Sequence, residues 1–169
     1  MIGKKFLIPA LALAAATCFA GPGDSNWSLR FGVVFPNTTN TGLSSDAGFS
    51  YSVAYRLYRG EGFSLHAEAQ GSVYSVNDGA GDDATITVGG LNLLGIAHMK
   101  SSPVYVGGTV GFTQATASSD GFTTTGETKG VWGVLAGVPL SRQWFVEGRY
   151  MWSDVPASRG TVVYAGYRF

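Results

Sequence analysis

Apolar and polar residues alternate with a period of two in eight separate segments of the chain. In the clearest one, 63–76, Leu65 shares a face with apolar and small residues, while His66 and Glu68 lie on the opposite face. Because successive side chains of a β-strand point to opposite sides, this period predicts strands. We expect them at 26–36, 48–58, 63–76, 85–98, 104–116, 129–139, 144–154 and 160–169.

The connections between these segments alternate in length. The tight ones are 59–62, 99–103 and 140–143. The others are mostly longer and rich in Gly, Ser, Thr, Asn and Asp, at 37–47, 77–84, 117–128 and 155–159. Tight turns at one end (the short-turn end) and longer loops at the other (the long-loop end) are typical of an up-and-down barrel. The predicted fold class is therefore all-β, an eight-stranded antiparallel barrel with both termini at the short-turn end.

The two faces of the segments differ in bulk and in charge. One face carries large apolar side chains such as Phe31, Val33 and Phe35, whereas the other is rich in small residues. Since an eight-stranded barrel has an interior only wide enough for side chains to fill it, the bulky face is predicted to lie outside. It carries no charge in any predicted strand, and a charge facing lipid costs about 2–4 kcal/mol at mid-depth. The pattern predicts a transmembrane barrel with a polar, side-chain-filled lumen.

The charged residues of the predicted strands fall on the inward face, Lys129 at the rim among them. We predict that six of them form a network that plugs the lumen, because mutual pairing offsets much of the cost of burying charge. Strand pairing is expected to set Arg56 opposite Ser64 or His66, and Glu147 opposite Arg168. The six predicted members are Arg30, Arg56, Glu68, Glu147, Arg149 and Arg168.

The start of the chain predicts export. Lys4 and Lys5 precede an apolar run at 6–16, and Ala20 ends a stretch with small residues at the positions that a signal peptidase reads. We expect a secretory signal peptide at 1–20 and a barrel domain at 21–169, with lipoprotein processing at Cys18 as the alternative. Without the two lysines, 9 of the 11 basic residues remain against 11 acidic ones. That balance gives no basic footprint for nucleic acid.

The last segment, TVVYAGYRF, alternates up to its final residue. It resembles the C-terminal assembly signal of bacterial outer-membrane proteins, and the matching positions are Tyr164, Gly166, Tyr167 and Phe169. With its signal peptide, length and strand count, the chain resembles the small eight-stranded outer-membrane barrels, the OmpX-like and OmpA transmembrane-domain-like proteins. The resemblance implies the outer membrane of a Gram-negative-type envelope and insertion by the barrel-assembly machinery. It also implies a monomer among outer-membrane lipids and lipopolysaccharide.

Candidate chemistry in the chain is sparse. Ser64, His66 and Glu68 share a face and are the residue types of a hydrolase triad. Same-face neighbours lie roughly 7 Å apart along a strand, so we expect lumen packing and no convergence. His98 and His66 lack the carboxylate cluster of a metal site, and the acidic loop at 77–83 lacks the ligand spacing of a calcium loop. The chain is predicted not to be an enzyme and to need no cofactor or metal.

The long connections are acidic, with only Arg159 as a counter-charge. Their acidic residues are Asp46, Asp78, Asp82, Asp83, Asp120, Glu127 and Asp154. One hypothesis is that divalent cations bridge some of these carboxylates to lipopolysaccharide phosphates; the other is that the charges only keep exposed loops soluble. Chelation that leaves lipopolysaccharide association unchanged would favour the second.

Three functions fit this pattern. The preferred one is a structural or surface-interaction role, adhesin-like, carried by the extracellular loops. The alternatives are a small pore, which planar-bilayer conductance would reveal, and an outer-leaflet lipid-modifying enzyme, which would alter lipid A on overexpression. Fold alone does not separate them, because one architecture supports many functions.

Overall fold

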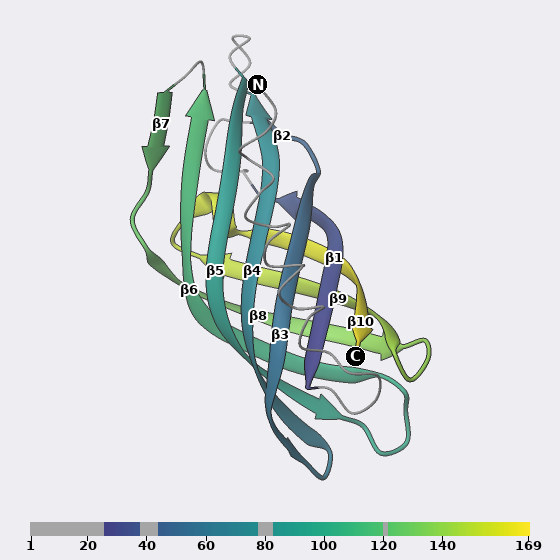
Figure 1. Ribbon diagram of the computed structural model, residues 1–169. Coiled ribbons are helices and arrows are strands. Elements are labelled where there is room, and N and C mark those ends of the chain that lie inside the picture. Colours follow the sequence, from purple (N-terminus) through teal and green to yellow (C-terminus); the bar gives the residue numbers. More distant parts are fainter. Residues whose placement is uncertain (1–25, 38–43, 78–82, 120–121) are drawn as a thin grey trace.

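Eight antiparallel strands close into a barrel (Figure 1). The computed structural model describes residues 26–37, 44–77, 83–119 and 122–169, so the predicted signal peptide lies outside the described residues. The predicted fold class and strand count are confirmed. Within the described part of the chain, no helix is long and apolar enough to cross a membrane.

The strands of the barrel follow one another in chain order. They are β1 (Trp27–Pro36), β3 (Gly48–Gly60), β4 (Phe63–Asn77), β5 (Asp83–His98), β6 (Tyr105–Ser119), β8 (Lys129–Pro139), β9 (Trp144–Ser153) and β10 (Gly160–Arg168). Each pairs with the next, and β10 closes on β1, where Leu29 stands opposite Tyr167. Closure pairs both edges of every barrel strand, as a membrane-spanning sheet requires. A single 3₁₀ turn, η1 (Pro156–Ser158), connects β9 to β10.

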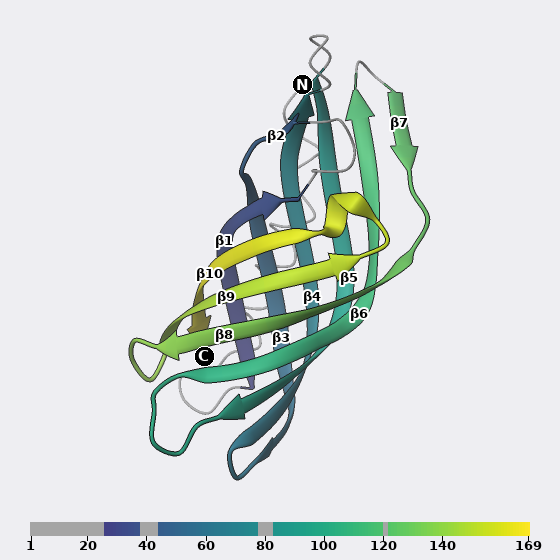
Figure 2. The ribbon, with the colours of Figure 1, turned by 180° about the vertical axis from the view of Figure 1, so that it is seen from behind.

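Two short strands lie where loops were predicted. β2 (Ser44–Ser45) pairs with β4, and β7 (Phe122–Thr125) pairs with β6. β4, β5 and β6 have 15 or 16 residues, whereas β8, β9 and β10 have 9 to 11. The ends of the long strands therefore rise past the rest of the barrel with β2 and β7 beside them (Figures 1 and 2). We call this extension, at the long-loop end, the projecting sheet.

The outside of the barrel is apolar, as predicted. Its large exposed side chains include Phe31, Val33, Phe35, Phe49, Leu91, Leu93, Val110, Phe112, Trp132 and Val134. On β6 the outward apolar positions stop at Phe112, and Gln114 and Thr116 follow on the same face toward the long-loop end. On β5 the last outward leucine toward that end is Leu91, and Gly89 and Thr87 come next on the same face. The change from apolar to polar side chains marks where the apolar band ends and the projecting sheet begins.

The lumen is filled in layers. Near the short-turn end, Leu94 and Ile96 are buried with Tyr105, Leu135 and Phe145. β5 carries leucines on both faces, and the burial of Leu94 and Ile96 leaves Leu91 and Leu93 on the outside. Asn92 and His98 lie on the inward side with Leu94.

A second apolar layer lies toward the long-loop end. It consists of Val34, Tyr74, Val76, Val88, Val162 and Tyr164. A cavity of about 20 Å³ lies beside this layer, with room for about one water molecule. Buried charged residues contact both layers, because Arg149 lies over the Tyr164 ring and Arg30 over the Phe145 ring.

Candidate functional site

Glu68 is the centre of the charged layer. Its carboxylate accepts two hydrogen bonds from Arg149, at 2.6 and 2.8 Å, and one from the Arg30 guanidinium at 3.1 Å. Ser52 donates a further hydrogen bond at 2.8 Å and Asn92 one at 3.4 Å. Glu68 is only 3% exposed. The two-point contact with Arg149 is the geometry in which a guanidinium binds a carboxylate most strongly.

Glu147 completes the charged layer. One carboxylate oxygen accepts a hydrogen bond from Arg149 Nε at 2.6 Å and lies 3.4 Å from Arg30 Nε. The other accepts a hydrogen bond from the Tyr105 hydroxyl at 3.0 Å. Two arginines and two glutamates therefore form a neutral cluster, which we call the lumen network, drawn from β1, β4 and β9. Every member is at most 3% exposed.

Two glycines give the aromatic neighbours of this network their room. A Cβ at Gly137 would overlap the Tyr105 ring, and a Cβ at Gly166 would overlap the Phe145 ring. Phe145 in turn packs against two guanidinium groups, with Arg30 5.3 Å and Arg168 4.7 Å from the ring centroid. Cations over aromatic faces attract, so these rings seal the network while also contacting its charges.

Two of the six residues predicted for the network lie outside it. Arg56 and Arg168 line a cavity at the short-turn end and make no ion pair with a described carboxylate. Arg56 does stand opposite His66, one of the two partners expected. The predicted pairing of Glu147 with Arg168 is wrong, because Glu147 stands opposite Tyr164. The connection between β9 and β10, which contains the 3₁₀ turn at 156–158, is therefore centred nearer to β9 than the predicted pairing required.

A β-bulge adds an arginine to the short-turn end that the alternation did not predict. The β3–β4 register shifts between Arg56 and Tyr58, so that Arg56 faces His66 and Arg59 faces Ser64. Ser64 and His66 are both inward, so Arg59 also points inward, although it is separated from Arg56 by an odd number of positions. Bulges commonly re-aim side chains in this way near functional sites.

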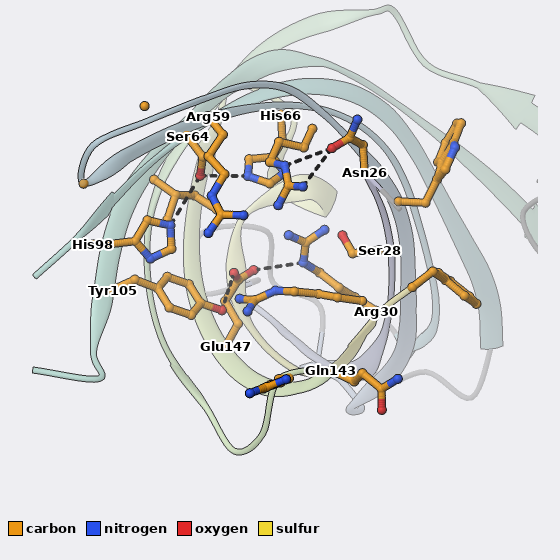
Figure 3. Close-up of a pocket in the computed structure, with 18 residues that line it drawn as sticks. Asn26, Ser28, Arg30, Arg59, Ser64, His66, His98, Tyr105, Gln143 and Glu147 are labelled. Atoms are coloured by element: carbon orange, nitrogen blue, oxygen red, sulfur yellow. Dashed lines mark hydrogen bonds and ion pairs between the residues drawn. The ribbon is translucent and has the colours of Figure 1, made fainter. Parts of the chain in front are cut away.

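The cavity at the short-turn end has a volume of about 730 Å³. Figure 3 shows side chains from around the barrel converging on it, including Arg59, His66, His98 and Tyr105, with Glu147 and Arg30 beside them. We call it the basic vestibule. The arginines that line it are Arg30, Arg56, Arg59, Arg142 and Arg168, whereas Glu147 is the one acidic side chain among its lining residues.

Ser64 and His66 meet, contrary to the sequence-based expectation. Ser64 Oγ lies 3.0 Å from His66 Nε2 and 3.4 Å from His98 Nε2. The imidazole leans along the strand and spans the distance that separates the backbone positions. The third residue does not join them, because Glu68 is bound by arginines, Ser52 and Asn92. His66 Nδ1 has no hydrogen-bond partner among the described residues. The described residues therefore provide no carboxylate to orient this histidine as a triad requires.

The four residues of the predicted assembly signal lie on both faces of the closing strand. Tyr164 is inside and shares a hydrogen bond of 2.8 Å with Ser50, and Gly166 is inside against Phe145. Tyr167 is outside and packs edge-to-face on the Phe169 ring at 5.2 Å. The Phe169 amide donates a hydrogen bond to Trp27, so β1 holds the chain up to this residue.

The acidic residues predicted for the rim are spread along the long-loop end. Asp78, Asp82 and Asp120 lie outside the described residues. Asp83 accepts a hydrogen bond from Asn77. Glu127 forms an ion pair with Lys129, and the hydrogen bond from Lys129 lowers the pKa of the Glu127 carboxyl. The described ranges contain no group of three His, Cys, Asp or Glu side chains that could hold a metal ion.

Comparison with known proteins was informative only at the level of structure. No protein-family model matches the chain, and no curated protein matches its sequence. The attachment invasion locus protein Ail of Yersinia pestis, in complex with the heparin analogue sucrose octasulfate, superposes with a TM-score of 0.57 at 13% identity. That match covers 85% of this chain and 97% of Ail. The chain has the fold of the small eight-stranded outer-membrane barrels.

Two further structures support the same assignment of fold. Ail in a phospholipid bilayer nanodisc matches with a TM-score of 0.53 at 14% identity, over 86% of this chain and 100% of that one. Neisserial surface protein A (NspA) matches with a TM-score of 0.53 at 18% identity, over 85% of this chain and 96% of NspA. At these identities the likeness concerns the backbone, so the role of the chain has to be argued from its own side chains.

Proposed function

We propose that the protein is an integral outer-membrane barrel that presents its long-loop end outside the cell as an interaction surface. Export by a cleaved signal peptide and insertion by the barrel-assembly machinery are part of this proposal. The uncharged apolar band and the shared fold of Ail and NspA support it. Outer-membrane lipids and lipopolysaccharide are its expected surroundings, and the barrel acts as a monomer.

The observation that favours a surface role over a pore is that side chains close the lumen. The lumen network crosses the interior at the bottom of the basic vestibule, and the apolar layer around Tyr164 fills the space between the network and the long-loop end. A solute would have to break four buried ion pairs between charged groups, which is costly in a low-dielectric interior. In this proposal the barrel serves as a scaffold, and the loops carry the contacts with a partner.

A catalytic role is disfavoured by the placement of the candidate residues. Ser64 and His66 lie at the short-turn end, opposite to the loops that would meet the outer leaflet. The described residues give His66 no orienting carboxylate. We propose that both side chains have a structural or binding role at the mouth of the barrel.

The projecting sheet is the surface best suited to contact a partner. Its outer side carries hydroxyl groups, and Thr85, Thr87, Thr123 and Thr125 are exposed there. Its inner side is apolar and packs around Tyr74. The acidic balance of the rim disfavours a sulfated polyanion of the kind bound to Ail, because like charges repel. We expect a neutral, hydroxyl-rich or cationic partner, or lipopolysaccharide bridged by divalent cations.

The test is to shorten the projecting sheet and measure adhesion. Replacing Ser118–Thr123 by Asn-Gly should keep the pair Ala117 and Thr124 and close a two-residue hairpin. Cells that display the wild-type protein should adhere to some immobilised glycans or matrix proteins more than cells without it, and the shortened variant should lose most of this adhesion. Loss of adhesion would reflect the missing surface only if the variant is still inserted.

Cysteine labelling provides that control, because Cys18 in the predicted signal peptide is the chain's one cysteine. A membrane-impermeant maleimide should label Thr85→Cys in intact cells but not Lys100→Cys at the short-turn end. Equal adhesion of wild-type, shortened and empty cells, with Thr85→Cys labelled as expected, would contradict the proposed surface role.

A further inference from the structure

The basic vestibule concentrates positive charge in a chain that is neutral as a whole. The whole chain has as many acidic as basic residues, 11 of each. Five arginines nevertheless line this one cavity, with Glu147 as the only acidic side chain among the lining residues. Arg30 and Glu147 both belong to the lumen network. The remaining arginines, Arg56, Arg59, Arg142 and Arg168, have no ion-pair partner among the described residues.

The contacts that the structure shows for these arginines leave their charge unbalanced. Arg56 donates two hydrogen bonds to the neutral Asn26 side chain, at 2.8 and 3.1 Å. Arg168 lies over the Phe145 ring, and the bulge in β3 turns Arg59 inward. No carboxylate of the described residues lies within ion-pair distance of any of the four. Glu61 is nearby in the β3–β4 turn but is exposed and does not line the cavity.

Like charges around one enclosed space repel one another, and an anion in that space relieves the repulsion. Guanidinium groups bind phosphate with paired hydrogen bonds. The volume of about 730 Å³ lies within the range of small-molecule sites, roughly 300–1,000 Å³. Neutral groups that can exchange hydrogen bonds with phosphate oxygens, Ser64, His66 and His98, line the same wall.

We propose that the basic vestibule binds a small anion that carries two phosphate groups. The source of such an anion is either a soluble diphosphate or the headgroup of a diphosphate lipid in the adjoining leaflet. The site is separate from the long-loop surface, so anion binding here does not depend on the proposed adhesion role. Its ligand is held by Arg56, Arg59, Arg142 and Arg168, and the lumen network forms its floor.

Pyrophosphate is the probe for the shared chemistry. The barrel is refolded and placed in nanodiscs of phosphatidylcholine, and pyrophosphate binding is measured by titration calorimetry. We expect saturable binding to the wild type that weakens about tenfold or more in the double variant Arg59→Gln, Arg142→Gln, because each lost contact is a charge-assisted hydrogen bond. Both residues are exposed in turns or at a strand end, so this variant should fold normally.

The matched control is the double variant Lys100→Gln, Lys129→Gln. It removes the same net charge at exposed positions outside the cavity, and its pyrophosphate affinity should equal that of the wild type. Repeating the titration in discs that also contain cardiolipin identifies the source. If pyrophosphate no longer binds in the cardiolipin discs, the lipid headgroup occupies the site. If its binding is unchanged, the site takes a soluble anion. No binding in phosphatidylcholine discs, or equal weakening in both double variants, would overturn the proposal.

Discussion

Replacing Glu68 with alanine should lower the free energy of unfolding of the barrel by about 3–5 kcal/mol, the usual cost of breaking a buried ion pair from one side. The substitution removes both hydrogen-bond acceptors of the Arg149 fork and one contact of Arg30. Both guanidinium groups would stay in an interior that gives them only Glu147 as a carboxylate partner. Glu147→Ala should act in the same direction, since it also leaves the Tyr105 hydroxyl without its acceptor.

Urea titration of the barrel in lipid vesicles, followed by tryptophan fluorescence, measures this change. Asp154→Ala is the control, because it removes an exposed carboxylate at the long-loop end and should shift the free energy of unfolding by no more than about 0.5 kcal/mol. If Glu68→Ala costs no more than Asp154→Ala, the network does not stabilise the barrel.

Deleting Phe169 should strongly reduce the amount of barrel inserted in cells while changing its folding in detergent much less. The resemblance of the closing strand to an assembly signal predicts that cellular insertion machinery reads this residue. In the structure its ring contacts Tyr167 and its amide bonds to Trp27, so its loss also removes the last link between β10 and β1. The heat-modifiable fraction in isolated membranes measures insertion.

Phe112→Ala is the matched control for that deletion. It removes another outward-facing aromatic ring, 66% exposed at the long-loop edge of the apolar band, on β6 and not on the closing strand. Its cellular level should stay close to that of the wild type. Comparable levels of the Phe169 deletion and the wild type in membranes would show that this residue is not read as a signal.

The strands could be predicted from the sequence because lipid and lumen select opposite side chains along every barrel strand. All eight predicted segments correspond to barrel strands with ends displaced by only a few residues. The alternation is less regular on β5, where Leu91 and Leu93 face outward and Leu94 and Ile96 face inward, because the lumen near the short-turn end is itself apolar there. β2 and β7 escaped prediction, because serine and threonine in exposed, short strands do not alternate in polarity.

The site could be predicted only in part, because its geometry depends on register. Arg30, Glu68, Glu147 and Arg149 could be assigned to the lumen by parity alone. The partner of Glu147 could not, since the 3₁₀ turn before β10 changes the pairing by four residues relative to the expected one. Arg59 was missed for a similar reason: a bulge reverses parity without leaving a signature in the sequence.

Single-channel recording in planar bilayers tests the central claim, a barrel whose lumen is closed by its own charged residues, most directly. An eight-stranded barrel leaves little space beyond its side chains, and beyond the basic vestibule the lumen network and the apolar layer around Tyr164 occupy the interior. The wild-type protein should therefore show no steady conductance at either polarity. A large, stable single-channel conductance would contradict the closed lumen and favour the pore.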